Sequence, residues 1–329
     1  MDVKMKKGCN VLSTFGLITL LTLTVSTCSR AAPVAEVLGK AAAYVKSMQN
    51  ADGGWPLIQG GKSDIETTAL AIQALLFVGE GSGSETVSKG LNYLVKSQGE
   101  DGGWNENSAH TIFTVMALSE AGLSTHEALS IKALSWLRKK AQNADGSWAK
   151  NVGGVGNPVY TGAVLTGMKR VNLDTMYTPV PKGIQWLIDN RNSDGGWAIK
   201  KGEPSNTMAT AWAVQGLSIA AIDYAYTIEE SLNWLKQAQN DDGGFGLMKG
   251  QPSDSELTSY AVLALVAGKD TSTAGYRAVR YLREVQRKDG SYVSATPIEL
   301  KEPTANLQTT CFAIWAIVVE TISKKKSRK

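Results

Sequence analysis

One short motif recurs six times along this chain and restricts its fold more than any other feature. Each copy reads Gln or Arg, two variable residues, Asp-Gly, a Gly or Ser, and then an aromatic residue. The closing aromatics lie 44 to 49 residues apart and are Trp55, Trp104, Trp148, Trp197, Phe245 and Tyr292. A fixed period of this length indicates an architecture in which each repeat supplies one helical or stranded unit.

An amphipathic helix is predicted before each motif. Segments 90–98 and 231–239 place apolar residues at i, i+3 and i+4, with Lys on the opposite face. The Asp-Gly pair ends such a helix, because Gly tolerates the left-handed conformation and Asp favours the turn. We expect the closing aromatic to fold back over the helix end.

A second helix, apolar on all sides and therefore buried, is predicted after each motif. The six copies align without gaps on a Thr: Thr68, Thr111, Thr161, Thr210, Thr258 and Thr310. Four residues earlier every copy carries Asp or Asn, the residues that best cap a helix N-terminus: Asp64, Asn107, Asn157, Asn206, Asp254 and Asn306.

Together these helices predict an all-α fold, an (α/α)6 toroid of six helical hairpins in two concentric layers over residues 31–323. No alternating strand pattern is present. The first and last repeats keep apolar faces and lack polar caps. This favours a closed ring over an open solenoid.

The basic charge of the chain belongs to its two ends. The formal net charge is +4, but residues 1–28 carry +2 and residues 324–329 carry +5, which leaves about −3 for the rest. A nucleic-acid partner recognised by a basic field is therefore not expected.

Residues 1–30 are interpreted as an export signal. Three Lys, the last of them Lys7, precede an apolar segment over residues 11–28 and then small residues. Cleavage near residues 29–32 and lipid attachment at Cys28, which would tether the protein to a membrane, both remain open. Either outcome places the mature protein outside the cytoplasm, and residues 324–329 are expected to be a basic tail.

The Gln-x-x-x-Gly-x-Trp motif, with an aromatic-Leu pair upstream, resembles the repeat of squalene–hopene cyclases. Protein prenyltransferase β subunits have the same helical ring. The resemblance covers about residues 34–322 and implies a toroid whose inner helices line a central cavity, with its mouth at their N-termini. The same ring carries unrelated functions elsewhere, so function has to be argued from individual residues.

Class II cyclases protonate an isoprenoid with an Asp-x-Asp-Asp-Thr motif at the start of an inner helix. The matching residues here run from Asp64 to Thr68, in the order Asp-Ile-Glu-Thr-Thr. Glu66 thus stands where the resemblance puts the proton donor, and Thr67 replaces the third acid. The cyclases also enclose substrate with a second helical domain, whereas six repeats fill this chain.

Two Glu break the repeat two residues before the anchoring Thr, where the six copies carry Glu66, Ala109, Val159, Met208, Glu256 and Gln308. Such acids can simply compensate the helix dipole. Alternatively, Glu66 and Glu256 form a pair of carboxylates at the cavity mouth. His110 is the third catalytic candidate, and a capped surface histidine is the alternative for it.

Aromatic residues recur two positions after the Thr, at Phe113, Trp212, Tyr260 and Phe312. They could contact a prenyl chain or stabilise a carbocation, or they could be ordinary core. The predicted ligand-binding set consists of Asp64, Phe113, Tyr160, Trp212, Tyr260 and Phe312.

No metal site and no cofactor are predicted. Protein prenyltransferases hold Zn²⁺ with Asp, Cys and His, but this chain has only His110 and His126 and no Asp-x-Cys, and Cys311 is expected in the core. The first hypothesis is an exported toroid that binds an isoprenoid, another apolar molecule or a partner without full catalytic machinery. The alternatives are a class II terpene cyclase with Glu66 as general acid, and a polysaccharide-acting toroid enzyme.

Overall fold

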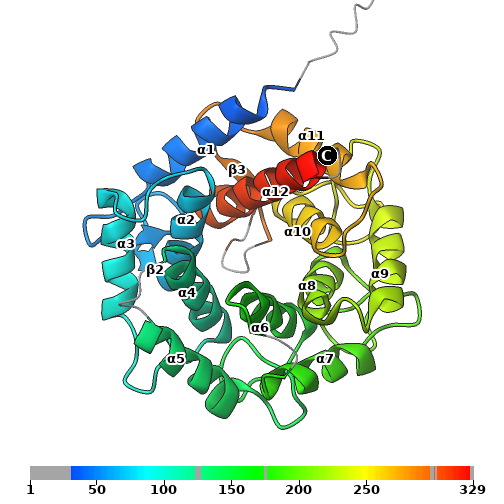
Figure 1. The fold of residues 1–329 in the computed structure, drawn as a ribbon. Helices are drawn as coiled ribbons and strands as arrows, with labels where there is room; N and C mark the ends of the chain where they lie inside the picture. Colours follow the sequence, from blue (N-terminus) through cyan, green and yellow to red (C-terminus); the bar gives the residue numbers. More distant parts are fainter. Residues whose placement is uncertain (1–30, 123–126, 174–175, 297–299, 301, 327–329) are drawn as a thin grey trace, which may run out of the picture. The chain divides into compact units, whose positions relative to one another are not determined.

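Twelve α-helices alternate between an outer and an inner ring in a computed structural model that describes residues 31–122, 127–173, 176–296, 300 and 302–326 (Figure 1). The outer ring consists of α1 (Val34–Ser47), α3 (Glu85–Lys96), α5 (Glu127–Trp136), α7 (Pro179–Asp189), α9 (Ala225–Ala238) and α11 (Ala274–Val285). The inner ring consists of α2 (Ile65–Phe77), α4 (Ser108–Glu120), α6 (Pro158–Arg170), α8 (Thr207–Leu217), α10 (Ser255–Ala267) and α12 (Leu307–Lys326). The predicted (α/α)6 toroid is confirmed. The segment interpreted as an export signal, residues 1–30 with Cys28, lies outside the described residues.

The ring closes through the same contacts that join neighbouring repeats. Helix α12 packs against α2 just as α2 packs against α4. In repeat 2 the motif glutamine, Gln98, donates a hydrogen bond to the carbonyl of Leu129 at the start of the next outer helix (3.1 Å). In repeat 6, Gln286 donates to the carbonyl of Val37 in α1 (2.8 Å). The last repeat is therefore joined to the first by the same hydrogen bond that joins repeat 2 to repeat 3.

The anchoring threonines are buried hydrogen-bond acceptors. Thr68 Oγ1 accepts the backbone N–H of Trp55 at 2.8 Å, and the equivalent bond occurs in all six repeats. The indole N–H of Trp55 donates to the carbonyl of Val45, near the C-terminal end of its own outer helix (2.7 Å). Each closing Trp thus folds back over its helix end, as predicted, and the Thr holds it against the inner helix.

All six predicted N-caps accept at least one first-turn backbone N–H through the side-chain oxygen. The caps are therefore confirmed, and they fix where each inner helix begins. The residues two and three positions after each N-cap lie in the first turn of an inner helix. Since all six inner helices begin in the same way, these equivalent residues lie at the same end of the ring.

Two short antiparallel ladders were not expected from the repeat. They pair β1 (Trp55–Pro56) with β2 (Ser63–Asp64), and β3 (Tyr292–Ser294) with β4 (Thr304–Asn306). They form because the chain returns from the closing aromatic to the N-cap, which brings the two segments side by side. The predicted boundary at residue 323 falls inside α12, where Lys324 lies 3.7 Å from Glu320 one turn earlier. No described helix has the length and apolarity needed to cross a membrane.

Candidate functional site

A cavity of about 410 Å³ opens at the N-terminal ends of the inner helices, and all six of them contribute to its wall. Its size lies near the lower end of the range for small-molecule sites. Seven of the nine predicted site residues line it: Glu66, Phe113, Tyr160, Trp212, Glu256, Tyr260 and Phe312. Asp64 and His110 are not among the lining residues.

Four aromatic rings from four inner helices form the floor of the cavity. The ring centroids of Tyr260 and Phe312 lie 4.8 Å apart, those of Trp212 and Tyr260 5.3 Å, and those of Phe113 and Trp212 6.0 Å. Each of the four side chains is at most 4% exposed. The rings are therefore both core and cavity wall, and the cavity ends at this layer.

Glu256 is fully buried in the cavity wall. Its Oε1 accepts hydrogen bonds from the hydroxyl of Tyr260 (2.5 Å) and the amide of Gln308 (2.8 Å), and its Oε2 accepts from the hydroxyl of Thr309. Burial raises the pKa of Glu256 to about 7, against the lowering effect of these three donors. The side chain can therefore hold or release a proton near neutral pH.

This raised pKa predicts a pH dependence of stability. Because the folded pKa of Glu256, about 7, exceeds its ordinary value of 4.5, the folded state binds this proton more tightly than the unfolded state. The stabilisation is complete below pH 4.5 and is lost as the pH rises through 7. Urea unfolding measures the free energy of unfolding of the wild type and of Glu256→Gln. Between pH 4.5 and 8 the difference between these two free energies should shift by roughly 3 kcal/mol in favour of the variant. A difference that is constant with pH would contradict the assignment.

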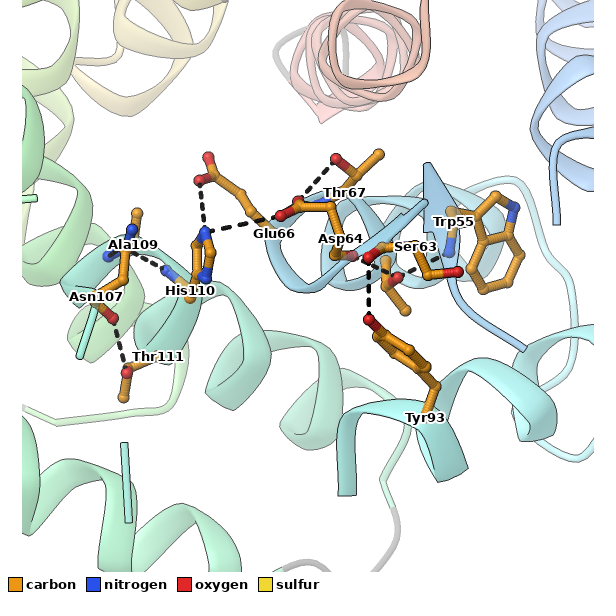
Figure 2. Close-up of polar contacts among 11 residues, drawn as sticks. Trp55, Ser63, Asp64, Glu66, Thr67, Tyr93, Asn107, Ala109, His110 and Thr111 are labelled. Atoms are coloured by element: carbon orange, nitrogen blue, oxygen red, sulfur yellow. Dashed lines mark hydrogen bonds and ion pairs between the residues drawn. The ribbon is translucent and has the colours of Figure 1, made fainter. Parts of the chain in front are cut away.

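His110 lies between the two acids of the cyclase-like motif (Figure 2). Its Nε2 is 3.9 Å from Asp64 Oδ2 and 3.9 Å from Glu66 Oε2. These distances are too long for hydrogen bonds, so the attraction depends on His110 being protonated. Asp64 Oδ1 accepts from both the backbone N–H (2.8 Å) and the hydroxyl (2.9 Å) of Thr67. Asp64 therefore serves as the cap of helix α2, and Glu66 is the acid of this motif that lines the cavity.

Loop residues complete the wall and were not singled out from the sequence. Lys150, Ile199 and Thr296 come from the segments between a closing aromatic and the next inner helix. From the closing aromatic to the anchoring Thr these segments have the same length in four of the six repeats, but they carry no helical periodicity, so the pattern did not indicate which of their side chains point to the cavity. Gln308 occupies the same alignment column as Glu66 and Glu256. The other three residues of that column are apolar, so the polar side chain of Gln308 was the sequence feature that could have identified it as a cavity residue. A groove of about 460 Å³ adjoins the cavity at Asn157 and Ile199.

The described residues contain no group of three or more His, Cys, Asp or Glu side chains that could hold a metal ion. Cys311 is fully buried in α12, and burial raises the pKa of its thiol well above the ordinary range. His126 lies outside the described residues. Cys311 is therefore poorly suited to act as a thiolate nucleophile.

Comparison with known families agrees with this geometry. Residues 164–328, just over half of the 329 residues, match the Prenyltransferase alpha-alpha toroid domain. The chain belongs to this toroid family. Residues 11–114 match the Squalene-hopene cyclase C-terminal domain. This matched range of the chain includes the Asp64–Thr68 segment.

Among curated relatives, drimenyl diphosphate synthase of Streptomyces showdoensis is 28% identical over 47% of this chain, and squalene–hopene cyclase of Zymomonas mobilis is 39% identical over 21%. The alignments cover 31% and 12% of these relatives, so the chain spans less than a third of their lengths.

Solved structures share the fold at low sequence identity. The type II terpene cyclase MstE from Scytonema, in complex with geranylgeranyl dihydroxybenzoate, superimposes with a TM-score of 0.66 at 14% identity, covering 88% of this chain and 98% of that one. A heparin-specific unsaturated glucuronyl hydrolase has a TM-score of 0.67 at 11% identity, covering 89% and 98%. Together with the two family matches, this shared fold makes the protein a terpene cyclase-like toroid.

Proposed function

We propose that the central cavity binds an isoprenoid or a similarly elongated apolar ligand, and that the protein works as a binding module. The observation that carries this proposal is the aromatic floor, in which rings from α4, α8, α10 and α12 face one cavity. Apolar side chains such as Val159 and Met208 line the wall above the floor. Burying a prenyl chain there gains roughly 25 cal/mol per Å² of apolar surface removed from water.

Three features of the acid site favour binding over full catalysis. Asp64 is held as a cap, Thr67 stands where class II cyclases are expected to carry a third acid, and Glu256 lies within the wall with no exposed surface. A proton donor for an alkene needs a protonated acid that touches the substrate. Glu66 and Glu256 both line the cavity, but only the side chain of Glu66, which is 21% exposed, has accessible surface there.

The binding proposal predicts micromolar binding of geranylgeraniol, measured by calorimetry with the purified protein. Ala163 lines the cavity and is 3% exposed, so Ala163→Phe should fill the space and weaken binding at least ten-fold. Ala163→Ser nearly preserves the volume and is the matched control, expected to bind within about two-fold of the wild type. Wild-type affinity in the Phe variant, with its fold intact by circular dichroism, would place the ligand elsewhere.

Class II cyclisation is the second candidate, and it rests on Glu66, which reaches the cavity beside His110. The match to 98% of the MstE chain shows that a type II terpene cyclase can have the size of this single toroid. Incubation with squalene and geranylgeranyl substrates, followed by mass spectrometry, separates the two candidates. A cyclised product that disappears in Glu66→Gln would replace the binding proposal, whereas retained but unchanged isoprenoid supports it.

The polysaccharide alternative gains no support from the cavity. Sugar-binding sites present aromatic faces on an accessible surface, but the four rings here are at most 4% exposed. The similarity to the glucuronyl hydrolase is one of fold alone.

A further inference from the structure

A second cavity lies beyond the aromatic floor of the central cavity. It has a volume of about 220 Å³, and residues toward the C-terminal ends of the inner helices line it, among them Met116, Leu263 and Val319. Most of its accessible surface is apolar. Two cavities thus follow one another through the middle of the ring.

The charged side chains in the wall of the second cavity have partners of their own. The Arg170 guanidinium pairs with Glu120 at 2.6 Å and lies 5.0 Å from the ring centroid of Phe77. Lys169 Nζ donates to the carbonyl (2.8 Å) and the hydroxyl (2.9 Å) of Ser218. These contacts account for both bases, so the remaining apolar surface suits an apolar chain.

Trp212 of α8 is the one described residue that lines both cavities. The partition between them is therefore a single side chain thick at this position. The ring centroid of Trp212 lies 5.3 Å from that of Tyr260 and 6.0 Å from those of Phe113 and Phe312, and the residue is 3% exposed. In a layer packed this closely, the indole cannot swing aside without displacing its neighbours.

The backbone that carries Trp212 is also fixed. Helices α6 and α8 touch at two glycines, because a Cβ atom at Gly162 would lie 2.2 Å from the carbonyl oxygen of Trp212 and one at Gly216 would lie 2.8 Å from the Cα atom of Gly162. Such a close approach leaves α8 no room to move toward α6. Trp212 is therefore a fixed wall and not a lid.

The position of this wall sets a length. A carbon group of an aliphatic chain takes about as much space as a water molecule in the liquid, roughly 30 Å³. The central cavity of about 410 Å³ therefore accommodates roughly fourteen carbon atoms, close to three isoprene units. The second cavity would add roughly seven carbon atoms, a little more than one unit.

We propose that Trp212 determines the length of the isoprenoid chain that the central cavity accepts, by closing the cavity at about three isoprene units. This inference rests on the proposed binding function. Any chain beyond the third unit stays outside the mouth and gains little from burial. Removal of the indole joins the two cavities and lets one further unit enter.

The experiment measures, by calorimetry, the affinities of geraniol, farnesol and geranylgeraniol, which have ten, fifteen and twenty carbon atoms and the same head group. In the wild type, affinity should rise at least ten-fold from geraniol to farnesol but less than about three-fold from farnesol to geranylgeraniol. In Trp212→Ala the second step should also reach at least ten-fold, because the added unit is now buried. Trp212→Leu keeps part of the apolar volume and should show a smaller change in the same direction.

Two further variants separate the partition from the rest of the cavity. Met208 lies one turn before Trp212 on α8 and lines only the central cavity, so Met208→Ala should change the affinities of all three alcohols by a similar factor. Leu263 lines only the second cavity. Leu263→Phe should leave the wild-type affinities unchanged and should abolish the gain that Trp212→Ala brings.

An unchanged dependence on chain length in folded Trp212→Ala and Trp212→Leu would overturn this inference and leave the binding proposal intact. Weaker geranylgeraniol binding in the single variant Leu263→Phe would overturn it too, because the chain would then already cross the aromatic layer. That test stands even where the Trp212 variants do not fold. Failure of the wild type to bind any of the three alcohols would overturn the binding proposal itself, and this inference with it.

Discussion

Replacing Trp197 with Ala will lower the free energy of unfolding by about 3–5 kcal/mol, the largest single effect that we expect in this protein. The side chain is fully buried, and its indole N–H donates to the carbonyl of Leu187 at 2.7 Å. Its backbone N–H is bound by Thr210, and the Arg191 guanidinium lies 5.7 Å from the ring centroid. Removing the ring leaves a cavity between the outer and inner helices of one repeat and an unpaired carbonyl.

Urea denaturation followed by circular dichroism measures this loss. Trp197→Phe is the control, because it keeps most of the apolar surface and loses chiefly the hydrogen bond. We expect it to cost about 1–2 kcal/mol. Equal losses in the two variants would mean that the hydrogen bond, and not the packing, dominates. A loss below about 1 kcal/mol for the Ala variant would contradict the role assigned to the repeat aromatics.

Replacing Gly290 with Ala will destabilise the closure of the ring by roughly 2–5 kcal/mol, the sum of a left-handed backbone cost and a steric clash. Gly290 has a φ of +91°, and a Cβ atom there would lie 2.2 Å from the carbonyl oxygen of Lys40 in α1. The neighbouring Gln286 joins the same two repeats by its hydrogen bond to Val37. The substitution therefore pushes the last repeat away from the first.

Gly60→Ala provides the matched control. Gly60 also has a positive φ, +77°, but nothing lies within 4 Å of the position that an added methyl group would take, so only the backbone cost of about 1–2 kcal/mol applies. Thermal unfolding of both variants, with hydrogen exchange of α1 and α11, separates global destabilisation from opening at the junction. Faster exchange in these two helices is expected for Gly290→Ala only. Similar behaviour of the two variants would show that the junction does not depend on this close approach.

Much of the fold could be predicted because its determinants are local. The Asp-Gly stop, the Asx cap and the anchoring Thr each act within one repeat, and the hydrogen bonds confirm the caps and the Thr alignment. The cavity could be anticipated in part for the same reason. Equivalent positions in six equivalent helices point to the same end of the ring, so one alignment column predicted Phe113, Trp212, Tyr260 and Phe312 together.

The environments of the two glutamates could not be predicted, since they depend on residues from distant repeats. Glu66 and Glu256 occupy the same column, yet Glu66 lines the cavity near His110 of the next repeat, and Glu256 is fully buried. Its donors Gln308 and Thr309 lie 52 and 53 residues further along the chain. A pKa near 7 follows from that packing, and no local pattern encodes it.

The sequence by itself determined the repeat, the two helical layers, the helix starts and the acids that interrupt the pattern. Short-range capping and periodicity are sufficient for these features. Only the tertiary structure decided that the ring closes through Gln286 and Val37, that aromatic rings divide its interior into two cavities, and that Lys169 and Arg170 face the second one. The physical reason is that a cavity exists only once the helices have packed around a common axis. The burial of each side chain and the electrostatic field on it are then set by neighbours from other repeats across the ring.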